Sequence, residues 1–314
     1  IGLALLMALL SSLALILFIT IPMRRLARSA DRVARNPQDY DSIPDLSYRR
    51  DEIGDLSVVI RDMTRGLYMR VDDIANFAAD VAHEIKNPLT SLRSASDTLR
   101  VAKTDEDREK LIAIIQQDVS RMSRLITDIS DASKVDANLA RDTAQILDVG
   151  EIVANIVTFY EQTQADGNLT IKDVSDLSEP AFIRAFETPF AQVLRNLIDN
   201  AVTFSPENGT VRVGATATDS HVTITVSDEG PGIPEDNLET VFDRFYTERP
   251  SGATFGSHSG LGLAICRQIM TAHKGRIWAD NLTDEDGNRL GAQFTVELPR
   301  QTEGNSPSQS RRKR

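Results

Sequence analysis

The sequence predicts a multi-domain chain in which a transmembrane helix is followed by all-α modules and then by an α+β sandwich. Residues 1–21 carry no charged side chain. Between residues 22 and 137, apolar residues recur at three- and four-residue spacing, which is typical of amphipathic helices. After residue 147, strand-like alternation appears between helical patterns. A chain of 314 residues has room for about two ordinary domains, at roughly 100–200 residues each.

The composition excludes several classes of function. Charged residues make up 26% and hydrophobic residues 41% of the chain, as in ordinary globular proteins. The net charge of −11 argues against a protein that binds nucleic acid through general basicity, so we expect no nucleic-acid partner. The single cysteine, Cys266, excludes an intrachain disulfide and a cysteine-based zinc site, and its apolar neighbours indicate a small buried side chain on a helix.

The segment from Ile1 to Ile21 has the length of a membrane-spanning helix, which needs about 20 apolar residues. It lacks the basic start and the small-residue cleavage site of a signal peptide, and it lacks the polar face of a globular helix. Basic residues follow directly, and these are Arg24, Arg25, Arg28, Arg32 and Arg35. By the positive-inside rule we expect an inner-membrane protein with lipid around residues 1–21 and residues 22–314 in the cytoplasm. Because the chain starts inside the apolar run, we also expect a sensing part upstream of it.

Residues 22–70 indicate two short amphipathic helices joined by a connector with two prolines. The apolar stripe of the first helix consists of Leu26, Ala30, Val33 and Ala34. The stripe of the second helix consists of Ile53, Leu56, Ile60, Met63 and Leu67. Neither short helix could bury its stripe alone, so we expect a parallel homodimer that forms a four-helix bundle.

Residues 71–137 indicate a long helical hairpin with an apolar seam on each helix. The break falls at residues 103–105, where Thr104 is a candidate N-cap with Asp107 three residues later. A hairpin with two apolar seams dimerises into a four-helix bundle. Without further motifs, this segment would be a dimeric spacer that carries no chemistry.

From residue 147 to residue 300 the pattern changes to that of an α+β sandwich with a mixed sheet covered on one face. Alternation predicts strands at residues 211–215, 222–226, 276–279 and 293–298. Helical patterns cover residues 150–166, 188–203, 235–242 and 260–273. The tail, residues 301–314, is polar and ends in four basic residues, and we expect it to be disordered.

The first chemical motif is His83-Glu-Ile-Lys-Asn-Pro-Leu. On a helical wheel centred on the seam at Val81, His83 falls at about 200° and Asn87 at about 240°, so both point away from the core, one turn apart. This phase argues against a core histidine, and Asn87 replaces the second histidine of a His-Glu-x-x-His zinc motif. An exposed imidazole beside Glu84 suits nucleophilic catalysis, because the carboxylate can accept one ring N–H and raise the basicity of the other nitrogen. Pro88 should bend the helix at this point.

Two further motifs suit a nucleotide. Asn196 and Asn200 lie four residues apart on one helix face, so their amides could hold a hydrated Mg²⁺ and phosphate oxygens, although asparagine pairs are also common on solvated helices. Asp228 ends a strand and precedes Gly230 and Gly232, which let a ligand approach the backbone. The Asp228 carboxylate could accept the exocyclic amine of adenine, and a plain polar turn is the alternative.

A third motif, Ser259-Gly-Leu-Gly-Leu, leads from a glycine-rich stretch into an apolar helix. Backbone N–H groups at a helix N-terminus form a phosphate site. The stretch is not a P-loop, because no Gly-Lys-Ser/Thr follows, and it opens no βαβ unit. Each motif alone is weak evidence, whereas the three in this order are strong evidence for nucleotide binding.

Together these motifs resemble the transmembrane sensor histidine kinases of bacterial two-component systems. The resemblance covers residues 22–299 and rests on His-Glu-x-x-Asn-Pro-Leu, Asn-Leu-x-x-Asn-Ala, Asp-x-Gly-x-Gly, Phe-Asp-Arg-Phe-Tyr and Ser-Gly-Leu-Gly-Leu. Pro22 and the Asp51-Glu-Ile-Gly element resemble a HAMP signal-relay module. Ile43-Pro-Asp-Leu, Arg49-Arg-Asp-Glu-Ile-Gly and Ala201-Val-Thr-Phe-Ser-Pro look like the ChvG/ExoS branch of envelope sensors in alphaproteobacteria.

The resemblance implies an enzyme that autophosphorylates His83 from Mg-ATP, passes the phosphoryl group to an aspartate of a cytoplasmic response regulator, and also dephosphorylates that regulator. Glu84 would orient His83, and Asn87 would position water for the phosphatase reaction. It also implies a homodimer and a GHKL (Bergerat) ATP-binding fold. The implied domains are a transmembrane helix (1–21), a HAMP relay (22–70), a dimerisation and phosphotransfer hairpin (71–137), an ATP-binding domain (147–300) and a basic tail (301–314).

For ATP and Mg²⁺ the resemblance implies a second set of residues. Asn200 would ligate Mg²⁺ with Asn196 beside it, and Asp228 would hold the adenine amine. The residues that would shape the pocket and its lid are Gly230, Gly232, Phe242, Phe245, Gly260 and Gly262. Thr203 departs from the family pattern, because many relatives carry a phosphate-binding lysine there, and Arg249 could supply the missing charge.

Two other classes of function stay open as alternatives. A GHKL-type ATPase would carry a glutamate base four residues before the metal-binding asparagine, where this chain has Asn196. A catalytically inactive relay would only bind partners, but all of the motifs are intact. His258 is unusual for the expected lid, and we assign it no role.

Overall fold

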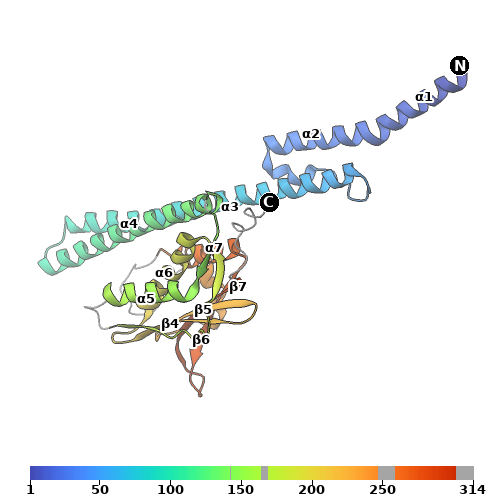
Figure 1. The fold of residues 1–314 in the computed structure, drawn as a ribbon. Coiled ribbons are helices and arrows are strands. Elements are labelled where there is room, and N and C mark those ends of the chain that lie inside the picture. The colour runs from blue at the N-terminus through green and yellow to red at the C-terminus, as the bar shows by residue number, and fades with distance from the viewer. Residues whose placement is uncertain (142, 164–168, 247–258, 302–314) are drawn as a thin grey trace. The chain divides into compact units, whose positions relative to one another are not determined.

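The computed structural model describes residues 1–141, 143–163, 169–246 and 259–301. The chain forms two compact units, Ile1–Glu84 and Ile85–Arg314 (Figure 1). The described part of the first unit is helical, whereas the second unit combines a helical hairpin with a seven-stranded sheet.

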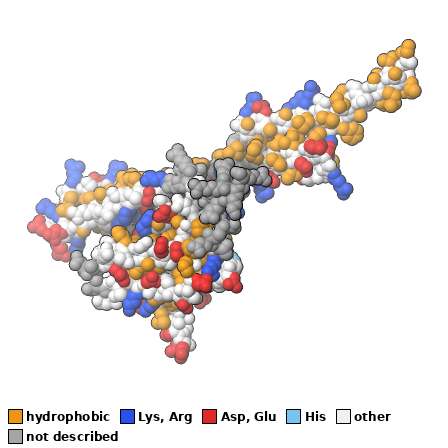
Figure 2. All heavy atoms as spheres, viewed as in Figure 1, with side chains coloured by type: hydrophobic (Ala, Val, Ile, Leu, Met, Phe, Trp, Pro, Cys, Tyr) orange, Lys and Arg blue, Asp and Glu red, His pale blue; other side chains and the backbone are white. Residues whose placement is uncertain are grey.

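The first unit begins with a long apolar helix. The helix α1 (Gly2–Leu15), the π-helical turn η1 (Ile16–Thr20) and the helix α2 (Ile21–Arg35) follow one another without a break. In the described part of the chain, Gly2–Arg35 is the one helix long and apolar enough to cross a membrane. None of the residues in its most apolar stretch is buried by the rest of the protein. Figure 2 shows hydrophobic side chains along the visible face of α1.

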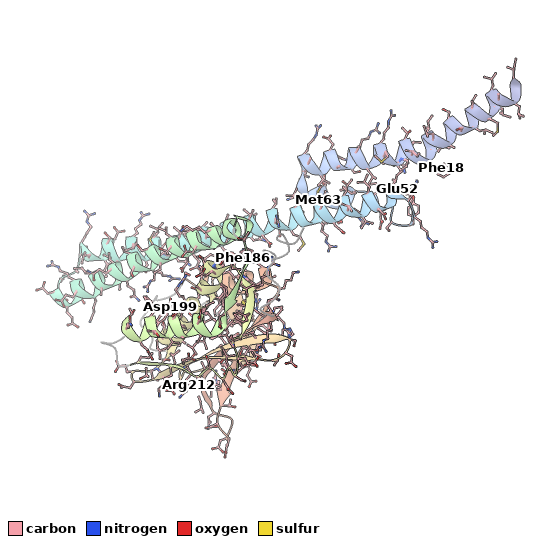
Figure 3. The ribbon with its side chains drawn as sticks, viewed as in Figure 1. Phe18, Glu52, Met63, Phe186, Asp199 and Arg212 are labelled. Atoms are coloured by element: carbon pink, nitrogen blue, oxygen red, sulfur yellow. The ribbon has the colours of Figure 1, made fainter. Side chains whose placement is uncertain are left out.

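Arg49 connects the helix around Pro22 with the Asp51-Glu-Ile-Gly element, because it binds both the carbonyl oxygen of Phe18 and the carboxylate of Asp51. Proline has no N–H, so it leaves the carbonyl oxygen of Phe18 without its helical donor. Arg49 fills the vacant position by donating from Nη2 to Phe18 O at 3.0 Å. The same guanidinium binds Asp51, holds the pKa of that carboxyl at about 2, and leaves it to accept the N–H of Gly54 at 3.1 Å. Figure 3 shows Phe18 and Glu52, the first residue of α3, at the same end of the helix pair.

A small core joins the two helices and their connector, which contains the 3₁₀ helix η2 (Pro37–Ser42). The core consists of Leu26, Val33 and Ile43, with Leu46, Ile53 and Ile60 packed against it. The apolar stripe predicted for the second helix divides: Ile53 and Ile60 pack against this core, whereas Leu56, Met63 and Leu67 are exposed in the single chain, as residues of a dimer face would be. The inward face also contains Ser57 and Thr64, whose hydroxyls donate to carbonyl oxygens at 2.8 Å. Because these two buried residues are polar, a search for apolar periodicity does not find this face of the helix.

The helix α3 (Glu52–Leu99) is longer than the sequence predicts. The second relay helix and the first helix of the hairpin form one continuous helix of 48 residues, with Pro88 inside it. The residues around position 70 include no proline, and Gly66 alone costs only about 1 kcal/mol in a helix interior. Nothing in this stretch is therefore strong enough to end the helix.

The turn of the hairpin forms as predicted. The helix α4 (Asp105–Arg141) begins directly after Thr104, whose hydroxyl oxygen accepts the N–H of Asp107 at 3.1 Å. Thr104 therefore acts as the N-cap, and three acidic residues in the first turn complement the helix dipole.

The hairpin carries apolar residues on two faces. Pro88 and Ala95 of α3 and Leu125 of α4 are buried. Three residues of α4 spaced seven apart stay exposed by 44%, 52% and 60%: Ile112, Val119 and Ile126. A spacing of seven places these side chains on one helix face, as at a coiled-coil seam. This uncovered seam fits the dimeric bundle that the sequence predicts.

The sheet of the second unit is mixed, as predicted. Its strands are β1 (Gln145–Asp148), β2 (Thr170–Asp173), β3 (Phe182–Ala185), β4 (Thr210–Ala217), β5 (His221–Ser227), β6 (Arg276–Thr283) and β7 (Arg289–Gln301). Their order is β1-β3-β7-β5-β4-β2, and β6 pairs with β7. The strands β2 and β4 are parallel, and the other pairs are antiparallel. The four strands expected from alternation are β4 to β7.

Three helices contact this sheet and lie together on one side of it in Figure 1: α5 (Val149–Thr163), α6 (Glu187–Phe204) and α7 (Gly262–Ala272). The helix α6 buries a stripe at three- and four-residue spacing that consists of Phe190, Val193, Leu194, Leu197, Ile198 and Ala201. Alternate residues of β4 and β5 are buried as well. Each large side chain in this core contributes about 1.5–3 kcal/mol, so packing against the sheet fixes the orientation of α6.

The helix predicted for residues 235–242 is wrong. The structure has two 3₁₀ turns there, Glu235–Asn237 and Thr240–Phe242. Arg267 donates from Nη2 to the carbonyl oxygen of Glu239 at 2.9 Å, and the buried Phe242 ring packs edge-on against Phe294. These tertiary contacts hold the segment in short turns.

His273 ties the end of α7 to the start of α6. Its Nδ1–H donates to Ile269 O at 2.7 Å, and its Nε2 accepts the N–H of Phe186, the N-cap residue of α6, at 2.9 Å. Only the neutral ring can make both bonds, because a protonated ring has no acceptor nitrogen. Burial lowers the pKa of His273 below its usual value of 6.5.

Acid is therefore expected to weaken this junction. Because the pKa is lower in the folded state, the contribution of His273 is present above about pH 6.5 and is lost as the pH falls toward the folded-state pKa. We expect His273→Gln to destabilise the fold by about 1–3 kcal/mol at pH 7.5, where the Phe186 N–H loses its partner. The difference in the free energy of unfolding between wild type and His273→Gln should be smaller at pH 5.5. Urea unfolding at both pH values, followed by the fluorescence of the single tryptophan, Trp278, measures this difference. A difference in the free energy of unfolding that is the same at both pH values would contradict the expected role of His273.

Candidate active site

A cavity of about 590 Å³ lies between α6, the start of α7 and the turn that follows β5. Six of the predicted site residues line it: Asn196, Asn200, Asp228, Gly232, Gly260 and Gly262. The volume is within the range of ligand pockets, about 300–1,000 Å³. The structure therefore brings the three nucleotide motifs of the sequence together in one place.

Asp228 is the buried acid of this cavity, with 3% of its surface exposed. Its Oδ1 accepts the N–H of Gly230 at 2.8 Å and the N–H of Ala292 at 3.1 Å. Burial raises the pKa of Asp228, and these two hydrogen bonds partly offset the shift. Both bonds reach the same oxygen, so Oδ2 makes no hydrogen bond within the described part of the chain. A fixed carboxylate with one uncommitted oxygen suits a ligand donor.

Glycine is required at three positions around the cavity. A Cβ at Gly230 would lie 2.6 Å from the carbonyl oxygen of Phe204. Gly232 and Gly260 adopt φ values of +70° and +73°, which other residues rarely tolerate, and a Cβ at either would approach a neighbouring atom to 2.7 Å. Gly262 differs, because a Cβ there would meet only Asn196 atoms at 3.8 Å. The space beside Gly262 is open, at the first residue of α7.

The helix α6 presents Asn196 and Asn200 to the cavity, because its opposite face is buried against the sheet. Asn196 donates from Nδ2 to the carbonyl oxygen of Gly262 at 3.1 Å, which links α6 to the start of α7. Asp199, which is labelled in Figure 3, also lines the cavity and accepts the hydroxyl of the buried Tyr160 at 2.5 Å. The described residues hold no cluster of three or more His, Cys, Asp or Glu that could bind a metal. The polar side chains of Asn196, Asp199 and Asn200 that α6 presents to the cavity are two amides and one carboxylate.

Phe242 and Phe245 lie next to the cavity rather than in its lining. Phe242 is 3% exposed, and the guanidinium of Arg267 sits 4.8 Å from its ring centroid. Phe245 has a φ of +61°, and its N–H donates to the carbonyl oxygen of Gly260 at 2.8 Å. Arg249 and His258 lie outside the described residues.

The residues of the histidine motif stand on α3. His83 and Asn87 are exposed, whereas Glu84 and Ile85 are half-buried and Pro88 is buried. The outward phase predicted for His83 and Asn87 is therefore confirmed. The helix continues through Pro88, and the bend expected there stays a prediction.

Three family models match successive parts of the chain. Residues 14–68 match the HAMP domain, residues 73–138 match the His Kinase A (phospho-acceptor) domain, and residues 186–302 match the Histidine kinase-, DNA gyrase B-, and HSP90-like ATPase. The chain is also 44% identical over 305 residues to Sensor protein ChvG of Rhizobium meliloti, and 44% identical over 304 residues to Sensor protein ChvG of Agrobacterium fabrum. The chain belongs to the sensor histidine kinases.

These alignments cover 95% of this chain but only 53% and 51% of the two ChvG proteins, so the chain spans about half the length of the curated relatives it matches. Among solved structures, histidine kinase ThkA in complex with response regulator protein TrrA matches 76% of this chain and 66% of its own, with 25% identity and a TM-score of 0.59. The expected architecture, with helical modules before a mixed-sheet ATPase domain, is thereby confirmed.

Thr203 stands where the resemblance implies a phosphate-binding lysine in many relatives. Thr203 lines the cavity, and its hydroxyl donates back to the carbonyl oxygen of Asp199 at 2.8 Å. Its hydroxyl is therefore bound to its own helix, and it provides no positive charge. Arg289 at the start of β7 does line the cavity, near Gly232. Arg289 was not predicted from the sequence, because a lone arginine after a polar turn resembles any solvated strand end.

The residues that hold Asp228 were not predicted from the sequence either. The carbonyl oxygen of Ala292 accepts the N–H of Asp228, and the N–H of Ala292 donates to Asp228 Oδ1. A Cβ at Gly291 would overlap the Asp228 carbonyl oxygen. The pair Gly291-Ala292 follows a turn signal at residues 284–288, which indicates a hairpin but not its neighbour in space.

Proposed function

We propose that this chain transfers the γ-phosphoryl group of ATP to His83 and from there to an aspartate of a response regulator, and that it also dephosphorylates the regulator. The observation that carries the proposal is the buried Asp228 carboxylate in a glycine-lined cavity of nucleotide size. The exposed His83, within the segment that matches the phospho-acceptor model, supplies an acceptor for the phosphoryl group.

ATP fits the cavity through two kinds of contact. The uncommitted Oδ2 of Asp228 would accept the exocyclic amine of adenine, and Gly230 and Gly232 let the base lie against the backbone. At the opposite end, the N–H groups at the start of α7, next to Gly260 and Gly262, would face the phosphates. Phe242 and Phe245 would hold the lid segment against this site, and Arg249 would add positive charge.

Mg²⁺ fits the amide wall of α6. Asn200 would ligate the ion through its side-chain oxygen, with Asn196 one turn earlier on the same face. Mg²⁺ commonly keeps several waters and binds through few protein ligands plus substrate phosphates, which agrees with the absence of an acidic cluster among the described residues. When bound, the ion would neutralise charge that develops on the phosphates.

The chemistry at α3 divides among three residues. A ring nitrogen of His83 would attack the γ-phosphorus; the new N–P bond forms as the bond to the bridging oxygen breaks, and ADP leaves. Glu84 would accept the other ring N–H and keep the attacking nitrogen basic. Asn87, one turn from His83 on the exposed side, would position the water that hydrolyses the phosphorylated regulator.

The proposed assembly is a homodimer in the inner membrane. The exposed seam at Ile112, Val119 and Ile126 would pair with a second copy, and lipid would surround residues 1–21 with residues 22–314 in the cytoplasm. The proposed domains are 1–21, 22–70, 71–137 and 147–300, with a basic tail at 301–314. We propose a response regulator as the protein partner and no nucleic-acid partner, in line with the net charge of −11.

A labelling experiment tests this function. The purified chain in detergent is incubated with Mg²⁺ and ATP labelled at the α- or the γ-phosphate. We expect label from the γ-position only, and we expect acid to release it, because a phosphoramidate bond is acid-labile. No incorporation, or label that withstands acid, would contradict the proposal.

The contribution of Asp228 gives a separate prediction. Asp228→Ala removes a charge-assisted hydrogen bond to adenine worth about 1.5–3 kcal/mol, so the Kd for ATP should rise roughly ten- to a hundredfold. Asp228→Asn keeps an oxygen for the two N–H groups but turns an amide toward the base, so it should weaken ATP more than GTP. Calorimetric titration measures both. Glu229→Gln is the control, because Glu229 binds Arg212 at 2.6 Å instead of lining the cavity. ATP affinity that is unchanged in both Asp228 variants would exclude this binding mode.

A further inference from the structure

Asn281 on β6 binds both backbone groups of Ile233. The N–H of Ile233 donates to Asn281 Oδ1 at 2.7 Å, and Asn281 Nδ2 donates to Ile233 O at 2.6 Å. Ile233 is 7% exposed, so water cannot replace these bonds freely. Asn281 thus acts as a side-chain substitute for a strand partner, 48 residues away in the sequence.

The bonded segment is the turn that lines the nucleotide cavity. Gly232 and Ile233 both belong to the lining, and Gly232 has a φ of +70°. A Cβ at Gly232 would lie 2.7 Å from Asn281 Oδ1, so the amide packs directly against the turn. Asn281 itself is not among the residues that line the cavity, and it stands behind the wall rather than in it.

The other end of the same turn is held by the cross-strand neighbour of Asn281. In the β6–β7 ladder, Asn281 pairs with Ala292. The N–H of Asp228 donates to Ala292 O at 3.0 Å, and the N–H of Ala292 donates to Asp228 Oδ1 at 3.1 Å. The cross-strand pair Asn281–Ala292 therefore holds the turn at two points. The backbone of Ala292 binds Asp228, and the side-chain amide of Asn281 binds Ile233.

We propose that Asn281 is a positioning residue for recognition of the nucleotide base. It holds Gly232 and Ile233 so that the base can lie flat against the turn while it reaches the Asp228 carboxylate. This inference rests on the proposed ATP site, and it adds the β6–β7 hairpin to the elements that determine base specificity. Within the described residues, both side-chain hydrogen bonds of Asn281 go to Ile233, and none goes to α6 or to the start of α7, which form the phosphate end of the cavity.

The test compares two asparagines of one hairpin in the full chain in detergent. Asn281→Ala removes both bonds to Ile233. Asn288→Ala is the matched control, because Asn288 bonds only Asp284 in the exposed turn. Affinities for ATP, ADP and GTP are measured by calorimetry, and KM and kcat are measured for autophosphorylation.

Asn281→Ala should raise the Kd for ATP and for ADP by the same factor, about tenfold for two lost hydrogen bonds. The ATP-over-GTP preference should fall, and kcat at saturating ATP should stay within about twofold of wild type. A general loss of structure would not produce this combination. The control should match wild type in every value. If Asn281→Ala does not fold, Asn281→Asp, which keeps an acceptor for the Ile233 N–H and loses the donor to Ile233 O, should show the same changes.

Three results would overturn the inference: a folded variant with wild-type affinities, a loss confined to ATP with ADP unaffected, or a loss of kcat with unchanged KM. These outcomes are distinct from failure of the proposed function. If wild type and Asn288→Ala bind no ATP, the nucleotide site itself is wrong. If both bind ATP and Asn281→Ala binds it equally well, only the role of Asn281 is wrong.

Discussion

His83→Gln is expected to abolish transfer of the γ-phosphoryl group to the protein while nucleotide binding stays at the wild-type level. Glutamine offers an amide nitrogen whose lone pair is delocalised, so it cannot attack phosphorus as an imidazole does. His83 is exposed on α3, so the substitution leaves no cavity and should not alter folding. Label incorporation should fall below detection, a loss of at least about 10³-fold given the size of nucleophile knock-outs.

The control for this variant is a second histidine. His221 lies at the start of β5, and within the described residues its ring hydrogen-bonds the neighbouring Ser220 at 2.9 Å. His221→Gln should therefore keep wild-type labelling, and both variants should bind ATP alike in calorimetry. Label that persists in His83→Gln, or that disappears in His221→Gln, would place the acceptor elsewhere.

Glu84→Ala and Asn87→Ala are expected to separate the two reactions of the helix. Loss of the Glu84 carboxylate leaves the imidazole without an orienting acceptor, and autophosphorylation should fall by about 10²-fold, the lower range for general acid–base groups. Asn87 would hold a water near a phosphoryl group docked on the exposed side of the helix. Asn87→Ala should therefore lower phosphatase activity at least about tenfold while autophosphorylation stays within about threefold.

Both activities are measured on each variant, with a response regulator that the wild-type chain phosphorylates. Asn76→Ala serves as the control, because Asn76 lies three turns before Asn87 on nearly the same face and bonds Asp72 at 3.2 Å. It should leave both activities intact. A parallel decrease of both activities in Asn87→Ala would show that this helix face does not divide its functions between two residues.

The sequence predicts best where one physical constraint dominates. The buried stripe of α6 and the alternation in β4 and β5 follow from burial on one face, and both appear in the structure. The N-cap at Thr104 follows from local hydrogen bonding alone, and it forms as predicted. The outward phase of His83 and Asn87 follows from helical geometry.

The sequence predicts poorly where distant contacts decide local structure. The strands β1, β2 and β3 have four residues each, too few for a reliable alternation pattern. Their pairing selects them: β1 pairs with β3, β3 with β7, and β2 with β4. Residues 235–242 carry a helical pattern, but Arg267 binds the Glu239 carbonyl oxygen and Phe242 packs on Phe294. Ser57 and Thr64 face the core of the first unit despite their polarity, because carbonyl oxygens accept their hydroxyls.

The candidate site shows the same division. Asp228, Gly230 and Gly232 are found from the sequence because a ligand site needs an acid and a close backbone at a strand end. Asn281 and Ala292, which hold that turn in place, carry no such signal, because their function exists only in the register of β6 with β7. Residues that would contact a ligand are therefore easier to predict from a sequence than the residues that position them.

The central claim is that His83, among the four histidines of the chain, receives the phosphoryl group. The most direct test is to phosphorylate the wild-type chain with Mg-ATP, digest it at neutral pH, and locate the phosphate by mass spectrometry with a fragmentation method that preserves the N–P bond. We expect one phosphorylated peptide, which contains His83 and carries the phosphate on the imidazole ring. Phosphate on another histidine, on a serine or on a threonine, with none on His83, would contradict it.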